Sequence, residues 1–321
     1  MNKKKLAVLV MLTMPFHSAV AHDNDAASAP FPEKIWVTMK QSGTLTVFPD
    51  GVTWPGGPNM LYDAVTPDGR MVMATSPSSN KLYAFDGSSG KILKVIPVGK
   101  APKGVKVTPD GREAWVSNQG SNEISVIDLR SLQVVATIST EAGPHNVRFT
   151  RDGRIAYATL QGGAGLGVID VSQRKMLRVI PTPGLTGPHN LDLTPDEKTA
   201  FVRDFVHNVG VVDLTSGQVK KVIRVGNAHG GIDVTPDGRF AAAAAIAENY
   251  ISVIDTQTLQ MTNIEVGQGP HGIRASRDSR WLYVSLTREN ALAVVDLRTF
   301  KVTAKIPTEK FPFWVAVQGN P

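Results

Sequence analysis

Short runs of alternating apolar and polar residues recur along most of the chain. Alternation with a period of two over such lengths is typical of half-buried β-strands. In residues 102–139 the pattern predicts four strands, at 104–107, 113–117, 123–128 and 133–138. Thr108-Pro-Asp-Gly111 separates the first two strands and predicts a tight turn in which Gly111 has a positive φ. No segment shows the longer period of an amphipathic helix.

This four-strand unit is repeated, and two columns of aspartates mark the repeat. Neighbouring members of either column are 41 to 44 residues apart. The column in the first turn is Asp68, Asp110, Asp152, Asp196, Asp237 and Asp278, and the column that ends the third strand is Asp86, Asp128, Asp170, Asp213, Asp255 and Asp296. A period in the low forties with four short strands per unit predicts the blades of a β-propeller.

The two ends of the chain complete one blade between them. Residues 35–38 and 44–50 look like second and third strands without a first strand, whereas residues 313–317 look like a first strand with nothing after it. Joining them removes two open sheet edges. We therefore predict an all-β chain with a single seven-bladed β-propeller over residues 34–321, closed by N- and C-terminal strands. In the N-terminal blade, residues 54–58 are expected to replace a regular fourth strand.

The N-terminal residues predict export. Lys3-Lys-Lys5, a short apolar run and Ala19-Val-Ala21 have the order of a signal peptide over residues 1–21. We expect cleavage following Ala21, a periplasmic or secreted mature protein, and a flexible arm over residues 22–33. No stretch has the roughly 20 apolar residues that a membrane-spanning helix needs, so no membrane span is expected.

The charge and cysteine content limit the classes of binding partner that the sequence favours. The chain has 34 Lys and Arg, 28 Asp and Glu, and no Cys. Three of the lysines belong to the predicted signal peptide, and the remaining balance does not favour nucleic acid. The absence of Cys excludes disulfides. We expect a monomer whose partner is a small ligand or another exported protein.

Four of the seven histidines occupy one position of the repeat. His145, His189 and His271 each follow a Gly-Pro pair, and His229 stands at the same place in a unit with one extra glycine. The position lies at the turn into the first strand, nearest the axis, so the four imidazoles are expected to line part of one funnel. Neutral imidazole is a ligand for copper, zinc, nickel and iron. The four are candidate ligands for copper or another transition metal, or for a haem-type cofactor with an axial histidine.

Other interpretations of the histidines stay open. Copied repeats can carry a residue without needing it, and an imidazole at this position can bind a neighbouring blade's backbone, with no cofactor at all. His145 shares its strand parity with Val147 and Phe149, which favours a ring buried between blades. Cleavage after Ala21 would also expose His22, whose amino group and ring can chelate copper if a second histidine is near.

Charged residues recur further along the first strands. They are Lys106, Arg148, Asp192, Asp233 and Arg274. Opposite charges in adjacent blades are expected to pair, which offsets the cost of burying them. The alternative is a charged gate, or a carboxylate site made by Asp192 and Asp233.

One segment carries a resemblance to a known family. Asp110-Gly-Arg-Glu-Ala-Trp-Val-Ser-Asn-Gln-Gly-Ser-Asn-Glu-Ile-Ser-Val-Ile-Asp128 resembles the "YVTN" β-propeller repeat of exported bacterial and archaeal proteins, and the likeness extends over residues 34–318. The wider group includes haem d1 propellers and seven-bladed lactonases, with the histidine-copper propellers of nitrous oxide reductase and thiocyanate dehydrogenase as distant analogues. The resemblance implies the fold and assigns no catalytic residue.

The sequence therefore favours a binding function. No nucleophile elbow, HExxH motif or Ser–His–acid arrangement stands out, so whether the chain is an enzyme is left undecided. We expect an exported periplasmic binding or assembly protein that holds a metal or cofactor in the histidine-lined funnel. The alternatives are a copper-dependent oxidoreductase using the same histidines, a lactonase- or lyase-like enzyme, and a pure protein-interaction scaffold.

Overall fold

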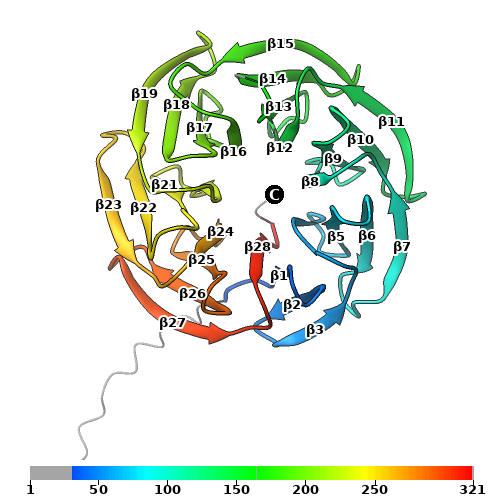
Figure 1. Cartoon of the computed structure of the whole chain (residues 1–321), viewed down its shortest axis with the longest axis horizontal. Coiled ribbons are helices and arrows are strands. Elements are labelled where there is room, and N and C mark those ends of the chain that lie inside the picture. The colour runs from blue at the N-terminus through cyan, green and yellow to red at the C-terminus, as the bar shows by residue number, and fades with distance from the viewer. Residues whose placement is uncertain (1–30, 164, 320–321) are drawn as a thin grey trace, which may run out of the picture. The chain divides into compact units, whose positions relative to one another are not determined.

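The computed structural model describes residues 31–163 and 165–319, which form 28 strands and, within those ranges, no helix. The strands make seven antiparallel sheets of four strands each. Figure 1 shows the sheets as blades around a central axis, with the first strand of a blade innermost and the fourth at the rim. The prediction of an all-β, seven-bladed propeller is confirmed.

Six of the blades each use four consecutive strands. They are β4 (Asp63–Val65), β5 (Met71–Ser76), β6 (Lys81–Asp86) and β7 (Ile92–Pro97); β8 (Pro102–Val107), β9 (Glu113–Asn118), β10 (Glu123–Asp128) and β11 (Gln133–Ser139); β12 (Pro144–Phe149), β13 (Ile155–Leu160), β14 (Gly165–Asp170) and β15 (Lys175–Pro181); β16 (Pro188–Leu193), β17 (Thr199–Asp204), β18 (Asn208–Asp213) and β19 (Gln218–Arg224); β20 (Ile232–Val234), β21 (Phe240–Ala243), β22 (Tyr250–Asp255) and β23 (Met261–Glu265); β24 (Pro270–Ala275), β25 (Trp281–Leu286), β26 (Ala291–Asp296) and β27 (Lys301–Pro307). The strands of the unit at 102–139 agree with the predicted ones to within two residues.

The seventh blade joins the two ends of the described chain. Its order is β28 (Pro312–Val317), β1 (Ile35–Met39), β2 (Thr44–Phe48) and β3 (Val52–Pro55). β28 runs antiparallel to β1, with Ile35 opposite Val317. The predicted closure is confirmed.

The prediction that residues 54–58 replace a regular fourth strand is wrong for residues 54 and 55, which belong to β3. Trp54 lies in β3 and pairs with Leu45. Its ring packs 6.5 Å from the ring of Trp36 and 6.1 Å from that of Phe85, measured between centroids. Because this burial holds the indole against the blade, the backbone on either side of it stays in register.

The repeated aspartates serve the turns. Asp110 Oδ1 accepts hydrogen bonds from the Thr108 hydroxyl (2.6 Å) and the Arg112 amide (3.0 Å), and Gly111 takes a φ of 71°. In the second column, Asp128 Oδ1 accepts from the amide of Ser131 at 2.7 Å. Both columns therefore have a local structural role. The repeated histidines have no such role in a turn.

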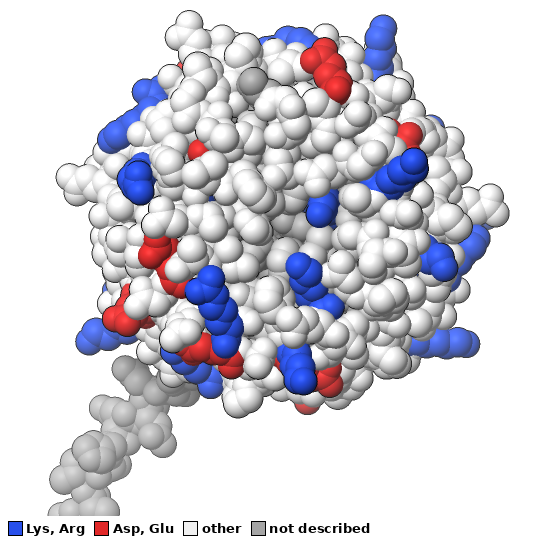
Figure 2. Space-filling model, in the orientation of Figure 1, with Lys and Arg blue, Asp and Glu red and all other residues white. Residues whose placement is uncertain are grey.

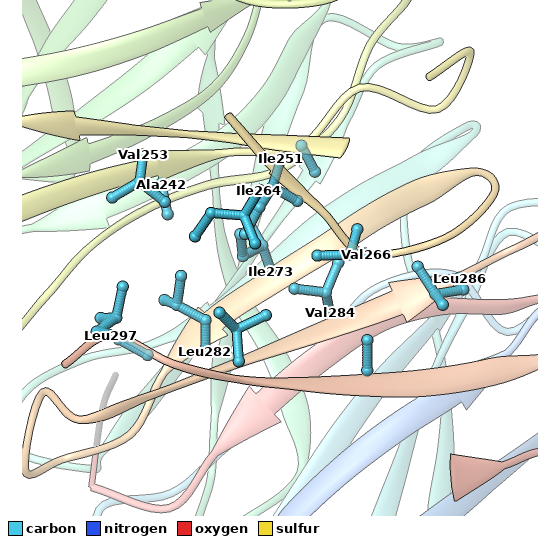
Figure 3. Packing of buried hydrophobic residues seen from close by; sticks show 14 of the residues in the cluster. Ala242, Ile251, Val253, Ile264, Val266, Ile273, Leu282, Val284, Leu286 and Leu297 are labelled. Atoms are coloured by element: carbon cyan, nitrogen blue, oxygen red, sulfur yellow. The ribbon is translucent and has the colours of Figure 1, made fainter. Parts of the chain in front are cut away.

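The core lies between neighbouring blades. Figure 3 shows the cluster between the blade of β20–β23 and the blade of β24–β27, where Ala242, Ile251 and Val253 face Ile273 and Val284. All of these side chains are at most 2 % exposed. The alternation seen in the sequence thus buries one face of each strand against the next blade.

The N-terminal predictions lie mostly outside the described residues. This holds for the predicted signal peptide, the cleavage site after Ala21 and His22. Of the predicted arm, residues 31–33 are described, and Phe31 stacks on Phe48 and Tyr283 with centroid distances of 6.0 and 5.4 Å. That part of the arm therefore packs against the propeller.

The surface offers no concentrated charge on the face shown in Figure 2. Lys and Arg side chains are scattered across that face and do not merge into one patch. Among the described residues there is also no helix with the length and apolar character needed to cross a bilayer.

A candidate metal site among the axial histidines

The four repeated histidines lie side by side near the propeller axis. His145 is in β12, His189 in β16 and His271 in β24, while His229 precedes β20. Their ring centroids are 3.8 Å apart for His145 and His189, 4.9 Å for His189 and His229, and 5.2 Å for His229 and His271. The repeat position therefore brings all four imidazoles into one cluster, as the sequence predicts.

Two more rings close the cluster into a circuit. Phe313 lies 3.8 Å from His271, and Tyr62 lies 5.7 Å from Phe313 and 5.4 Å from His145, between centroids. We call these six residues the axial ring cluster. Apart from the half-buried His229, its members are at most 5 % exposed. The expectation of an open funnel is wrong, because packed rings fill the space that the predicted funnel would occupy.

A β-bulge explains why the alternation of side chains along β12 does not predict the direction of the His145 ring. In β12, Pro144 pairs with Leu160 and Val147 with Ala158, so the register shifts by one residue across His145. β24 has the corresponding shift between Pro270 and Ile273. An extra residue in one strand re-aims the side chains beside it. The histidines can therefore face their neighbours around the axis although Val147 packs between blades.

Backbone hydrogen bonds fix the tautomer of two imidazoles. Nδ1 of His145 lies 2.9 Å from the carbonyl oxygen of His189, and Nδ1 of His271 lies 3.1 Å from that of Phe313. A carbonyl oxygen only accepts, so Nδ1 carries the proton in both rings. Nε2 of each ring then keeps its lone pair, which is the state that a metal ligand requires. Nε2 of His271 is buried and has no hydrogen-bond partner.

The imidazole of His189 lacks a hydrogen-bond partner among the described residues. Both of its ring nitrogens are buried and unsatisfied. The carbonyl in the next blade that corresponds to the acceptor of His145 is that of Gly230, and it accepts from the Asn190 amide at 2.9 Å instead. A buried polar atom without a partner costs roughly 1–3 kcal/mol, so the site calls for a ligand such as an ion or water.

The extra glycine of the fourth histidine unit changes the place of His229. The ring lies outside the strand, half-buried, and stacks on Phe205 with centroids 4.8 Å apart and planes 4° from parallel. Phe205 is 43 % exposed. His229 thus lies between the buried histidines and the solvent.

Arg203 holds the loop that carries His229. This side chain is fully buried and donates to the carbonyl oxygens of Gly226 (2.9 Å) and Ala228, with Ala228 directly preceding His229. It also contacts the carboxylate of Asp204 at 3.0 Å. Arg203 is not among the predicted site residues, although the sequence distinguishes it from its equivalents in other blades. It replaces the Thr or Ser found at this place in other second strands, such as Thr159 and Ser285.

Three of the four histidines bring ligand atoms together. One nitrogen each of His189, His229 and His271 lies within 4.8 Å of the other two. Nitrogen ligands at 2.0–2.1 Å from one ion are about 3.3–3.6 Å apart, so the rings need to close by about 1 Å to bind a metal. His145 is outside this set and supports His189 by stacking on it. Among the described residues, no other group of three or more His, Asp or Glu side chains has this geometry.

The electrostatics keep the cluster neutral. Burial lowers the pKa of His145, His189 and His271 well below the usual range. Burial, followed by the charges of Arg203, Lys40 and Lys103, lowers the pKa of His229 to about 4. The imidazoles are therefore neutral ligands at physiological pH. The same three cations oppose the entry of a metal ion, which limits its affinity.

Four of the five charged residues further along the first strands pair as predicted, whereas Lys106 forms no ion pair with the described residues. Arg148 Nε lies 2.8 Å from Asp192 Oδ1, and Arg148 Nη2 lies 3.1 Å from Asp233 Oδ1. Arg274 makes a second contact with Asp233. Because both carboxylates are held by arginines, the pairs offset the cost of burial and leave no support for a hydrolytic carboxylate site.

Comparisons with known proteins agree on the fold. The family model described as YNCE-like beta-propeller matches residues 105–185, which span two of the seven blades. Among solved structures, the chain is similar to the hydrazine synthase of Kuenenia stuttgartiensis, with a TM-score of 0.74 and 21% identity over 81% of this chain and 90% of that chain. It is also similar to a functionally unknown protein from Desulfotomaculum acetoxidans DSM 771, with a TM-score of 0.73 and 15% identity over 90% of this chain and 100% of the other.

These similarities define the architecture alone. No curated protein matches the chain. At identities of 15% and 21%, the similarity shows a shared fold and assigns the chemistry of neither protein to this chain. The protein is a seven-bladed β-propeller with local similarity to the YNCE-like family.

Proposed function

We propose that this chain is an exported, periplasmic propeller of the YVTN type that binds one transition-metal ion, with copper favoured, on His189, His229 and His271. The observation that carries the proposal is the pair of unsatisfied, buried nitrogens of His189 beside two other imidazoles. Imidazole binds copper more tightly than the other divalent ions of the first row. A set without carboxylates or thiolates also gives no preference for calcium, magnesium or structural zinc.

The packing favours a bare ion over a haem-type cofactor. The axial ring cluster fills the centre with side chains whose centroids are 3.8 to 5.7 Å apart. A planar macrocycle would have to displace several of them, whereas an ion needs only a closure of about 1 Å. Access is from the side of His229 and Phe205, where the cluster meets solvent.

The competing function is a copper-dependent oxidoreductase. Three protein ligands leave a fourth coordination position for a substrate or water, as in catalytic sites. A binding or assembly role remains our choice because the three cations near His229 weaken metal binding and because the described residues contain no acid–base pair at the cluster. Exchangeable binding suits a carrier better than a permanent redox centre.

Metal analysis of matched variants tests the proposal. His189→Phe keeps a ring in the stack and removes both nitrogens, and His207→Phe alters a histidine of the neighbouring loop outside the cluster. We expect the wild type and His207→Phe to bind about one equivalent of Cu(I) or Cu(II), and His189→Phe to bind at least tenfold more weakly. His145→Phe should retain binding, because His145 only supports the site.

Two results would overturn the proposal. One is equal copper affinity in His189→Phe and wild type. The other is no binding of copper or zinc at micromolar concentrations by folded wild-type protein. An electron paramagnetic resonance spectrum with coupling to nitrogen from three imidazoles would identify the ligands, and turnover of a redox dye only in the copper-loaded wild type would favour the oxidoreductase.

A further inference from the structure

A cavity lies at the end of the first strands opposite to the axial ring cluster. It has a volume of about 200 Å³, and its walls combine apolar side chains with three cations. The apolar residues include Val65, Val107 and Phe149, and the cations are Lys106, Arg148 and Arg151. In β12, His145 lies near the start of the strand and Phe149 at its end. The cavity is therefore separate from the axial ring cluster.

Lys106 is the cation that lacks a partner. It is only 7 % exposed, and none of the described residues forms a hydrogen bond or ion pair with its amine. The nearby cations Arg148 and Arg274 are both engaged with Asp233. Burial, followed by the charges of Arg148 and Arg274, lowers the pKa of Lys106 well below its usual range, so an anion bound beside the amine would favour its charged form.

Asp63 does not fill that role. It shares with Lys106 and Arg274 the wall of a small adjoining space of about 10 Å³, roughly the size of one water. Neither carboxyl oxygen of Asp63 has a hydrogen-bond partner, and no ion pair joins it to Lys106. Burial raises the pKa of Asp63 well above its usual range, against the opposing charges of Lys106 and Arg274, and so disfavours its charged form.

With Lys106 in its ammonium form beside a bound anion and with Asp63 neutral, the charge count leaves one positive charge. Lys106, Arg148 and Arg274 face two paired carboxylates, Asp192 and Asp233. A ligand with a single negative charge would balance the group. The apolar walls and the small volume add that the rest of this ligand is compact and non-polar.

We propose that this cavity binds a small organic monocarboxylate, with its carboxylate on Lys106 and its apolar body against Val65, Val107 and Phe149. Arg151 is exposed at the rim and attracts the anion from solvent. A dianionic phosphate fits less well, because Arg148 is already engaged with Asp192 and Asp233 and the walls beside Lys106 are largely apolar. The site is independent of the histidines and of any metal.

Calorimetric titration of the full chain with benzoate tests the site. Benzamide has nearly the same shape without the charge, and inorganic phosphate is an anion without the apolar body. Lys106→Met removes the ammonium and keeps the length of the side chain. Lys103→Met is the matched control, since Lys103 lies on the same strand three residues away, toward the histidines. We expect benzoate to bind wild type and Lys103→Met alike, and Lys106→Met at least tenfold more weakly.

The folded state of each variant is checked by its thermal midpoint. Lys106→Met is expected to melt at or above the wild-type midpoint, because it replaces a buried amine that has no hydrogen-bond partner in the described part of the chain with an apolar group. The proposal is wrong if benzamide binds as tightly as benzoate, if folded Lys106→Met retains wild-type affinity, or if no benzoate binds at 10 mM. Preference for phosphate over benzoate would also reject it and indicate an inorganic-anion site.

Discussion

Acid should destabilise the protein through His229 by an amount that its pKa defines. The folded-state pKa of this imidazole is about 4, lowered mainly by burial, against about 6.5 in an unfolded chain. Between these values the unfolded state binds more protons than the folded state, so stability present above pH 6.5 is lost as the pH falls. For this one group the loss is about 0.4 kcal/mol at pH 6.5 and about 2 kcal/mol at pH 5.

Comparison with His229→Gln isolates this contribution. Burial raises the pKa of Asp63 well above its usual range and that of Asp233 to about 6, and such groups have the opposite pH dependence. Their effects cancel in the difference between the two proteins. We expect the free energy of unfolding of the wild type, relative to His229→Gln, to fall by about 2 kcal/mol from pH 7.5 to pH 5.

Urea denaturation followed by tryptophan fluorescence, with a chelator present, gives both free energies. A difference that stays constant within about 0.5 kcal/mol across this pH range would refute the reasoning. It would mean that His229 is solvated in the folded protein and that the loop held by Arg203 does not bury it.

Three further predictions follow from the same structure. Deleting residues 311–321 removes β28 and leaves β1 with an open edge, so size-exclusion chromatography and urea denaturation should show aggregation or loss of cooperative unfolding; an unchanged midpoint would contradict the closure. Arg203→Met leaves the carbonyls of Gly226 and Ala228 without their donor, and should lower the free energy of unfolding by about 3 kcal/mol or more; a cost below about 1 kcal/mol would exclude the clamp. Bound copper should be retained down to pH 5 in equilibrium dialysis, because the free imidazoles are still neutral there; half-release near pH 6.5 would show ordinary, solvated histidines.

The strand pattern and the terminal closure were predictable because they depend on local signals. Alternation specifies which face of a strand is buried, and Thr-Pro-Asp-Gly specifies its turn. The incomplete units at 35–50 and 313–317 identify each other as partners. The ion pairs of Arg148 and Arg274 were also predictable, since equivalent positions in adjacent first strands must lie near one another.

The site was predictable only in part. The sequence places four histidines at one level of the propeller, but the alternation along the strands does not reveal the bulges in β12, β16 and β24 that set the direction of three of the rings. The inclusion of Tyr62 is likewise hidden, because it does not directly follow a Gly-Pro pair as three of the histidines do. Whether three imidazoles bind an ion depends on shifts of about 1 Å, which residue spacing does not specify.

The joining of β28 to β1 also determines the order in which the ring can form. Ile35 and Val317 are 282 positions apart, whereas the partners Val105 and Val116 in a neighbouring blade are 11 apart. In a flexible chain the longer closure costs about 3 kcal/mol more in entropy. β28 is also the last of the 28 strands to be synthesised. The six continuous blades should therefore assemble first and reduce this cost by holding the two ends close together. The joined blade then closes last, and its backbone amides should be the first in the propeller to exchange with solvent.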